Sequence, residues 1–197
     1  MERMRIMADT LTILGIPGSL RRASMNRGLL RAAQEVAPEG VTIDIYNLDD
    51  IPLFNGDVEA AGLPPAVHDF KERIRAADAL LFATPEYNYS FTGVLKNAID
   101  WASRPSPPPG NALRHKPAAM MGAGGGAGTG RAQLALRLVF VNTETYIMGR
   151  PELVVPNART LFDEHGDLLD EGIRERVGIV VEALVAWTHR LRRGLAE

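Results

Sequence analysis

The chain has 197 residues and a formal net charge of −2, which suits one domain with a sizeable core and gives no sign of a nucleic-acid partner. It contains no cysteine, so disulfides, thiolate metal sites and CxxC redox chemistry are excluded, and any redox function requires a bound cofactor. No stretch approaches the ~20 apolar residues of a membrane helix, and the four histidines lack metal-ligand spacing. We therefore expect a cytoplasmic protein with no metal site and no membrane partner.

Residues 1–9 are charged and lack the apolar core of a signal peptide. We expect them to form a loose N-terminal extension and residues 10–197 to form a single domain. No internal repeat and no long linker divides that domain.

Strand-like and helix-like segments alternate from Thr10 onward. Strands are predicted over residues 10–16, 41–46, 79–83 and 117–121, with a fifth, interrupted strand over 146–148 and 153–155. Helices are predicted over residues 25–36, 66–77, 92–102, 131–141 and 171–191, and residues 49–65 read as a loop. This alternation predicts an α/β fold, an open parallel sheet with helices on both faces, whose ligands bind at the carboxyl ends of the strands.

The first loop at that rim, residues 17–26, has the composition of a phosphate site. It joins an apolar strand to a helix, whose N-terminus offers unpaired N–H groups and a positive dipole end. Ser19, Ser24 and Asn26 can add uncharged donors, and Arg21 a charged planar fork. The alternative is that Ser24 only caps the helix and the arginines are solvated. The GxGxxG pattern of a NAD-binding Rossmann domain is absent here.

Two further loops are expected at the same rim. The tyrosine loop, residues 84–90, combines two tyrosines with an amide, a hydroxyl and a carboxylate, and such a turn suits a flat heteroaromatic ring. The glycine loop, residues 122–130, permits close approach of the backbone to a ligand. The alternatives are an ordinary surface turn and a flexible loop with no ligand. Taken together, the three loops indicate a phosphate at one end and a planar ring at the other, which is the shape of FMN.

Five segments together resemble the NADPH-dependent FMN reductase family, which includes flavodoxin-like quinone, chromate and azo-dye reductases. They are Gly18-Ser19-Leu20-Arg21-Arg22-Ala23-Ser24-Met25-Asn26, Ile51-Pro52-Leu53-Phe54-Asn55, Thr84-Pro85-Glu86-Tyr87-Asn88-Tyr89-Ser90 running on to Gly93-Val94-Leu95-Lys96-Asn97-Ala98-Ile99-Asp100-Trp101, Arg131-Ala132-Gln133 and Arg150-Pro151-Glu152. The resemblance covers nearly the whole chain after residue 9.

The resemblance implies a five-stranded flavodoxin-like sheet of order 2-1-3-4-5 that holds FMN without a covalent bond. It places the FMN phosphate on Ser19, Arg21, Ser24, Met25 and Asn26. It places the ribityl chain and the ring on Pro85, Glu86, Tyr87, Asn88 and Ser90, largely through backbone groups. The family often has a serine ahead of the glycines, whereas this chain has Gly122-Ala123, so backbone contacts from Gly124 and Gly125 are expected instead. A homodimer or homotetramer is implied, with Tyr89, Arg131 and Glu152 at the subunit contact.

The predicted activity is an FMN-dependent NAD(P)H oxidoreductase with a ping-pong mechanism. NADPH or NADH gives hydride to the flavin and leaves, and a small acceptor such as a quinone, chromate, an azo or nitro compound or free flavin then takes the electrons. No side chain is predicted to act as a nucleophile or acid, so no catalytic residue is assigned. The alternatives are a flavodoxin-type electron carrier without turnover of its own, and a flavin-free module that binds a phosphate ligand.

Overall fold

The computed structural model describes residues 10–105 and 110–194. The loose extension predicted for residues 1–9 lies outside these ranges. None of the helices within them has both the length and the apolar composition needed to cross a membrane.

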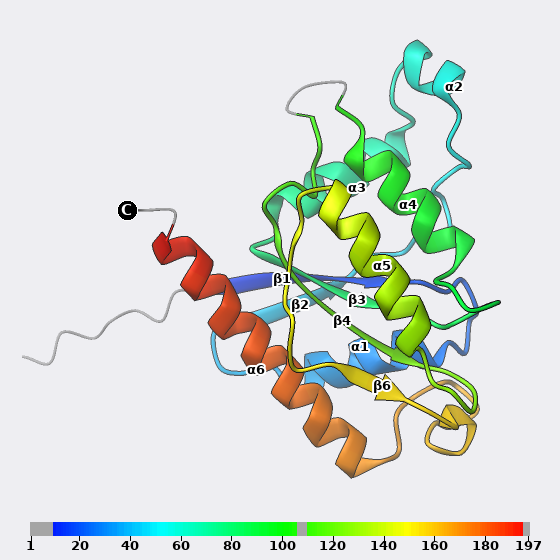
Figure 1. Ribbon diagram of the computed structural model, residues 1–197, viewed down its shortest axis with the longest axis vertical. Coiled ribbons are helices and arrows are strands. Elements are labelled where there is room, and N and C mark those ends of the chain that lie inside the picture. Colours follow the sequence, from blue (N-terminus) through cyan, green and yellow to red (C-terminus); the bar gives the residue numbers. More distant parts are fainter. Residues whose placement is uncertain (1–9, 106–109, 195–197) are drawn as a thin grey trace, which may run out of the picture.

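A parallel β-sheet runs through the centre of the molecule (Figure 1). Its strands are β1 (Leu11–Pro17), β2 (Val41–Ile45), β3 (Ala79–Ala83), β4 (Pro117–Ala123), β5 (Tyr146–Ile147) and β6 (Leu153–Val155). The order is β2-β1-β3-β4-β5, and β6 also pairs with β4. The predicted flavodoxin-like order 2-1-3-4-5 is therefore confirmed.

The predicted fifth strand is interrupted, as expected. Its first part, β5, pairs with Pro117 and Ala118, and its second part, β6, pairs with Met121, Gly122 and Ala123 of the same strand β4. The two parts form one broken edge strand, because the Met148 N–H still donates to Ala118 of β4 and residues 149–152 then leave the sheet before β6 returns to it.

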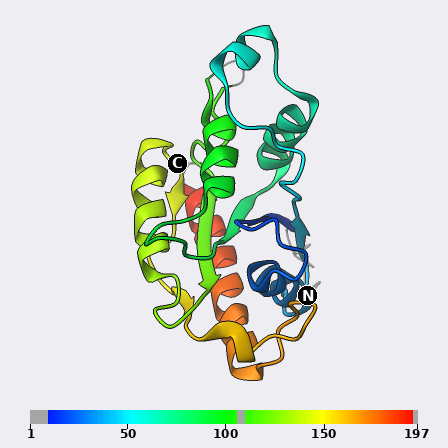
Figure 2. The same ribbon diagram turned by 90° about the vertical axis from the view of Figure 1, so that its right-hand side faces the viewer.

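Helices cover both faces of the sheet. On one face lie α1 (Met25–Glu35) and α6 (Glu171–Gly194), and on the other lie α3 (Pro65–Ala76), α4 (Gly93–Ser103) and α5 (Gly130–Asn142). Figure 2 shows this layering from the side. Alternate residues of each strand serve the two layers, since Ile13 packs with α1 and α6 while Leu14 packs with α3 and α4.

Two short helices were not predicted. The first, α2 (Gly56–Ala61), lies in the predicted loop over residues 49–65, and the second, η1 (Ala158–Thr160), is a single 3₁₀ turn after β6. No residue of α2 is buried, so it carries no apolar face that hydrophobic periodicity could detect. Local capping supports it instead, because the Asn55 side chain accepts the backbone N–H of Asp57.

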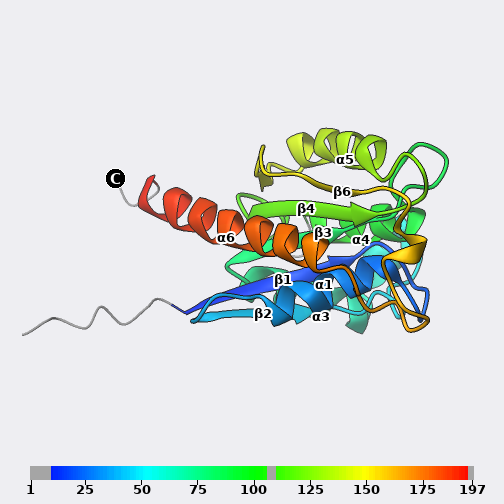
Figure 3. The same ribbon diagram turned by 90° about the horizontal axis from the view of Figure 1, so that it is seen from below.

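The parallel strands point toward one end of the molecule, where the first loop, the tyrosine loop and the glycine loop gather (Figure 3). The segment after β6, which contains η1, reaches the same end. The fold thus brings four loops to one rim.

Gly122 joins two of these loops by close packing. An added Cβ at this position would lie 2.3 Å from the Thr84 carbonyl oxygen and 2.4 Å from Thr129 Oγ1. Both distances are far below normal contact, so the backbone of β4 can approach the end of β3 only because residue 122 has no side chain.

We expect Gly122→Ala to destabilise the fold by about 1–3 kcal/mol, because the added methyl group forces the ends of β3 and β4 apart. Thermal unfolding checks this, with an expected fall in Tm of roughly 2–12 °C for a domain of this size. Gly125→Ala in the same loop is the control, since its Cβ would meet nothing within 4 Å. An unchanged Tm for Gly122→Ala would contradict the packing described here.

Candidate functional site

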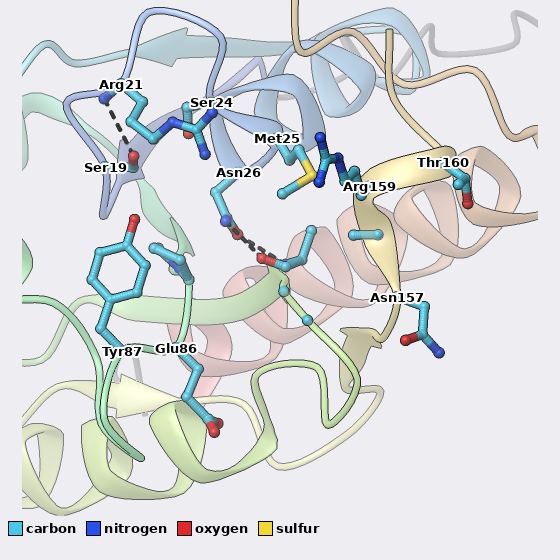
Figure 4. A pocket seen from close by; sticks show the side chains of 15 residues that line it. Ser19, Arg21, Ser24, Met25, Asn26, Glu86, Tyr87, Asn157, Arg159 and Thr160 are labelled. Carbon is cyan, nitrogen blue, oxygen red and sulfur yellow. Dashed lines mark hydrogen bonds between the residues drawn. The ribbon is translucent and has the colours of Figure 1, made fainter. Parts of the chain in front are cut away.

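A cavity of about 460 Å³ opens at the carboxyl ends of the strands and is called the rim cavity here (Figure 4). Ten of the twelve predicted cofactor-binding residues line it: Ser19, Arg21, Ser24, Met25, Asn26, Pro85, Glu86, Tyr87, Gly124 and Gly125. The other two, Asn88 and Ser90, do not line it. The remaining lining residues are Ala123 and the run from Asn157 to Thr160. Within the described ranges, no group of three or more His, Asp or Glu residues could hold a metal ion.

One end of the rim cavity is formed by the first loop and the start of α1. Ser24 is the N-cap of α1, and its Oγ accepts the backbone N–H of Arg27 at 3.3 Å. Ser24 therefore caps α1, and its hydroxyl still keeps its own hydrogen, which it can donate. The first N–H groups of the helix, at Met25 and Asn26, have no acceptor within the helix. This end of the cavity is rich in hydrogen-bond donors.

Ser19 and Arg21 complete that end. The Ser19 side chain is buried, and its Oγ accepts the backbone N–H of Arg21 at 3.3 Å, so its hydroxyl hydrogen also remains available. Arg21 is exposed and makes no ion pair with any side chain in residues 10–105 and 110–194. Its guanidinium is thus free to pair with an anionic ligand.

Asn26 has a structural task besides any ligand contact. Its Nδ2 donates to the Ala123 carbonyl oxygen at 2.9 Å, and its Oδ1 accepts the Ala123 N–H at 2.9 Å. The side chain is buried, so these two bonds tie the first loop to the glycine loop. Only the second hydrogen of the amide is left for a ligand.

The tyrosine loop makes a tight turn. Tyr87 and Ser90 exchange backbone hydrogen bonds of 2.9 and 3.0 Å, and the two residues between them have positive φ angles, 51° at Asn88 and 66° at Tyr89. This is the backbone of a type I′ turn, which Asn adopts readily and a bulky residue does not. The Tyr87 hydroxyl points into the rim cavity, toward the loop that carries Ser19 (Figure 4).

The Glu86 carboxylate points away from the cavity and toward α5 (Figure 4). Its Oε2 accepts the backbone N–H groups of Arg131 at 3.0 Å and Ala132 at 3.1 Å, and its Oε1 accepts Arg131 Nε at 2.6 Å. The Glu86 side chain is only 6% exposed. Burial alone would raise the pKa of this carboxyl, but the hydrogen bonds from Arg131 and Ala132 and the Arg131 charge hold it below its ordinary value. Glu86 can therefore meet a ligand only through its backbone.

Arg131 connects the start of α5 to the tyrosine loop on the outside. Its guanidinium carbon lies 3.8 Å from the centroid of the Tyr89 ring, which is cation–π geometry. Tyr89 is 71% exposed, so both side chains lie at the surface. Glu152, the third residue expected at a subunit contact, pairs within the chain with Arg137 and Arg150, each at 3.0 Å.

The sequence reasoning missed the segment from Asn157 to Thr160. The Asn157 N–H donates to the Gly125 carbonyl oxygen at 2.9 Å, and the Ala158 N–H donates to that of Gly124 at 3.0 Å. These bonds hold η1 against the glycine loop and bring Arg159 and Thr160 to the rim cavity. A signal was available, because the loop after the last parallel strand must end at the same rim as the others.

We expect Glu86→Gln to lower Tm near neutral pH. The two oxygens of the ionised carboxylate accept three hydrogen bonds, whereas the amide has one neutral oxygen, which accepts hydrogen bonds more weakly. The folded pKa of Glu86 lies below its unfolded value, so this stabilisation is present above the unfolded pKa of about 4.3 and is lost as the pH falls through the folded pKa. Tm measured from pH 7 downward checks this, and the gap between wild type and variant should narrow on acidification. A gap independent of pH would contradict it.

Comparison with known proteins agrees with this geometry. The model of the NADPH-dependent FMN reductase family matches residues 11–160. The chain is 50% identical over 187 residues to an NAD(P)H-dependent FMN reductase of Pseudomonas aeruginosa, a match that covers 94% of this chain and all of that protein. It is 45% identical over 190 residues to a probable NADPH:quinone oxidoreductase of Oryza sativa, which covers 93% of this chain and 94% of the relative.

A solved structure of similar shape is FerB, a flavoenzyme NAD(P)H:(acceptor) oxidoreductase from Paracoccus denitrificans. Its TM-score is 0.79 at 33% identity, with 91% of this chain and 98% of that chain covered. The family match extends over most of the chain and includes the first loop, the tyrosine loop, the glycine loop and η1. The protein therefore belongs to the NADPH-dependent FMN reductase family.

Proposed function

We propose that the rim cavity holds FMN and that the protein oxidises NAD(P)H and reduces a quinone or a similar small acceptor, one substrate after the other at the same site. The observation that carries the proposal is the chemistry of the two ends of the cavity. At one end, serine hydroxyls, Arg21 and the N-terminus of α1 offer hydrogen-bond donors and positive charge to a phosphate. At the other end, Tyr87 lies beside the backbone of Gly124 and Gly125, and such a lining suits a planar ring.

The first loop fits a phosphate in detail. Two buried serine hydroxyls, at Ser19 and Ser24, retain a hydrogen to donate, and the N-terminus of α1 adds backbone N–H groups and the positive end of its dipole. No acidic side chain lies in the first turn of α1 to oppose an anion. Arg21 supplies the positive charge, so these residues suit a phosphate dianion.

The other end of the rim cavity fits a flat ring. Pro85, Glu86 and Tyr87 line it from the tyrosine loop, and Gly124 and Gly125 line it from the glycine loop. An added Cβ at Gly125 would meet only open space, so a ligand can lie directly against the backbone there. FMN, when bound, would accept hydride from the nicotinamide and pass electrons to the acceptor. The chain's own residues bind the cofactor and orient it, and we assign none of them a chemical step.

The acceptor class is supported by the relatives. Proteins named NADPH:quinone oxidoreductase or quinone reductase from Oryza sativa, Arabidopsis thaliana and Pseudomonas putida are 39–45% identical to this chain over more than nine-tenths of its length. These relatives are named as oxidoreductases or reductases, so the comparisons do not favour an electron carrier without turnover. A cytoplasmic location is part of the proposal, because the reaction draws on a nicotinamide donor.

We also propose that the protein is a homodimer or homotetramer with α5 at the contact. Leu134, Leu138 and Val141 lie four and three residues apart on one face of α5 and are 65%, 72% and 76% exposed. An apolar stripe of this kind on a helix is typical of an interface. Arg131 lies on the same face of α5, one turn before Leu134, and its guanidinium stacks on Tyr89 of the tyrosine loop. Glu152 lies near this contact, because it forms an ion pair with Arg137 of α5.

The cofactor proposal is tested by the absorption spectrum of the purified protein, followed by anaerobic titration with NADPH and with NADH. We expect a bound flavin that bleaches on reduction and recovers when a quinone is added. A colourless protein that takes up no added FMN would overturn the proposal. A flavin that no nicotinamide reduces would favour an electron carrier.

We expect Arg21→Ala to weaken FMN binding roughly tenfold or more, because a charged hydrogen bond contributes about 1.5–3 kcal/mol. The measurement is the quenching of free FMN fluorescence during titration of the apoprotein. Arg22→Ala is the matched control, because Arg22 is exposed and does not line the rim cavity. Wild-type affinity in Arg21→Ala would refute the phosphate assignment.

We expect Leu138→Glu to shift the protein toward the monomer in sedimentation equilibrium, since a carboxylate would be buried at the contact. The control is Ile179→Glu on α6, where the side chain is 55% exposed but lies away from the stripe. An oligomer that survives Leu138→Glu unchanged would exclude α5 from the interface.

A further inference from the structure

A cavity of about 360 Å³ lies at the end of the sheet opposite the rim and is called the basal cavity here. It is lined by residues 75–78, which join α3 to β3, by residues 114–117 at the start of β4, and by residues 191–192 of α6. Figure 3 shows the C-terminal end of α6 at this end of the molecule, away from the loops of the rim. The basal cavity shares no lining residue with the rim cavity.

Positive charge predominates in the basal cavity. Four of its lining side chains are Lys or Arg and one is a carboxylate: Arg75, Arg114, Lys116, Arg192 and Asp78. Glu72 and Glu144 pair with Arg75 and Arg114 from outside this lining. The whole chain carries a formal net charge of −2, so the excess of positive charge is a local feature.

Lys116 has the least compensated charge of the four. Its side chain is partly buried and makes no ion pair with any side chain in residues 10–105 and 110–194. Its Nζ donates to two neutral acceptors, the carbonyl oxygens of Arg75 at 2.7 Å and Ala77 at 2.6 Å. Burial lowers the pKa of this ammonium, and the charges of Arg192 and Arg75 lower it further against the opposing charge of Asp78. An anion beside Nζ would offset the cost of this unpaired charge.

Part of this charge has a structural use. The carbonyl oxygens that Lys116 binds lie at the C-terminal end of α3, and Arg192 lies in the last turn of α6, where a cation complements the helix dipole. These uses leave hydrogen-bond donors over. Lys116 has a third hydrogen, Arg192 donates to Asp78 only through Nη2, and Arg114 donates to Glu144 only through Nε. Three cationic side chains thus keep donors for a ligand.

The arrangement of these donors suits a phosphate better than a carboxylate. Arg114 and Lys116 reach the cavity from the start of β4, and Arg192 reaches it from α6. Phosphate oxygens surround one atom in three dimensions and accept hydrogen bonds from several directions, whereas the two oxygens of a carboxylate lie in one plane. The lining also includes the apolar side chains of Pro117 and Leu191, which suit a small organic group esterified to the phosphate.

We propose that the basal cavity is a second ligand site, which binds a small phosphate monoester through Arg114, Lys116 and Arg192. The site lies at the amino ends of β3 and β4, whereas the rim cavity lies at their carboxyl ends. The inference goes beyond the proposed function and does not depend on the identity of the ligand in the rim cavity.

The test is calorimetric titration of the purified full-length protein with phenyl phosphate and with inorganic phosphate, at constant ionic strength. We expect saturable binding of phenyl phosphate, tighter than that of inorganic phosphate. Arg114→Gln and Arg192→Gln should each weaken it roughly tenfold or more, the size of one lost charge-assisted hydrogen bond. The matched control is Arg193→Gln, because Arg193 is the exposed neighbour of Arg192 on α6 and does not line the cavity. This control should leave the affinity within about twofold of wild type.

Several results would overturn the inference. Absence of saturable binding, or wild-type affinity in both Arg114→Gln and Arg192→Gln, would exclude the basal cavity as a phosphate site. An equal loss in Arg193→Gln would show general attraction to a positive surface, and equal affinities for the two probes would exclude an ester as the ligand.

A further variant separates the two cavities. Arg21→Ala should leave the affinity for phenyl phosphate unchanged, and a loss in that variant with none in Arg114→Gln would assign the probe to the rim cavity. Tm of each variant shows whether it folds. If Arg192→Gln does not fold, because Asp78 loses its partner, Arg114→Gln decides the test alone, since the Arg114 side chain is 57% exposed.

Discussion

The rim cavity depends on the pair of hydrogen bonds between the Asn26 amide and the backbone of Ala123. They join the first loop to the glycine loop across 97 residues of sequence, inside the protein, where an unmade bond would leave buried donors and acceptors unpaired. The glycine loop is held in turn by Asn157 and Ala158. The first loop, the glycine loop and the segment after β6 are thus fixed relative to one another by hydrogen bonds to the backbone at the ends of the strands.

The tyrosine loop is fixed differently, by a helix. Glu86 connects it to the first N–H groups of α5, and the Arg131 guanidinium stacks on the Tyr89 ring. The backbone of Tyr89 is left-handed, a conformation that is unfavourable for a bulky residue by roughly 1–2 kcal/mol. Strained residues in functional loops persist when their surroundings over-determine them. Here the surroundings are the N-terminus of α5, so the tyrosine loop and the helix with the exposed apolar stripe are one connected unit.

Much of this architecture could be predicted from the sequence, and the reasons are physical. Each of the strands β1 to β4 is a short apolar run or an alternating segment, and each long helix repeats apolar residues at helical spacing, so hydrophobic periodicity located all of them. The shared rim of parallel strands predicted that three loops lie together, and the family resemblance supplied most of the individual cofactor residues, ten of which line the rim cavity. Arg159 and Thr160 were missed because a 3₁₀ turn of three residues has no periodicity. The structural role of Asn26, whose side chain holds the first loop against the glycine loop, was missed because it depends on a contact 97 residues away that no local pattern encodes.

The Glu86 carboxylate makes the two helix ends at the rim differ in charge, and this difference sets the orientation of an anionic ligand. Both α1 and α5 begin at the rim, and both helix ends carry partial positive charge. At α5 the protein supplies its own counter-charge, because Glu86 accepts the N–H groups of Arg131 and Ala132. The first turn of α1 contains no acidic residue, so its end stays electropositive. The rim therefore has an electrostatic polarity: a molecule with one anionic tail is drawn to α1 and finds no second attractive end at α5, so it enters tail-first in a single orientation.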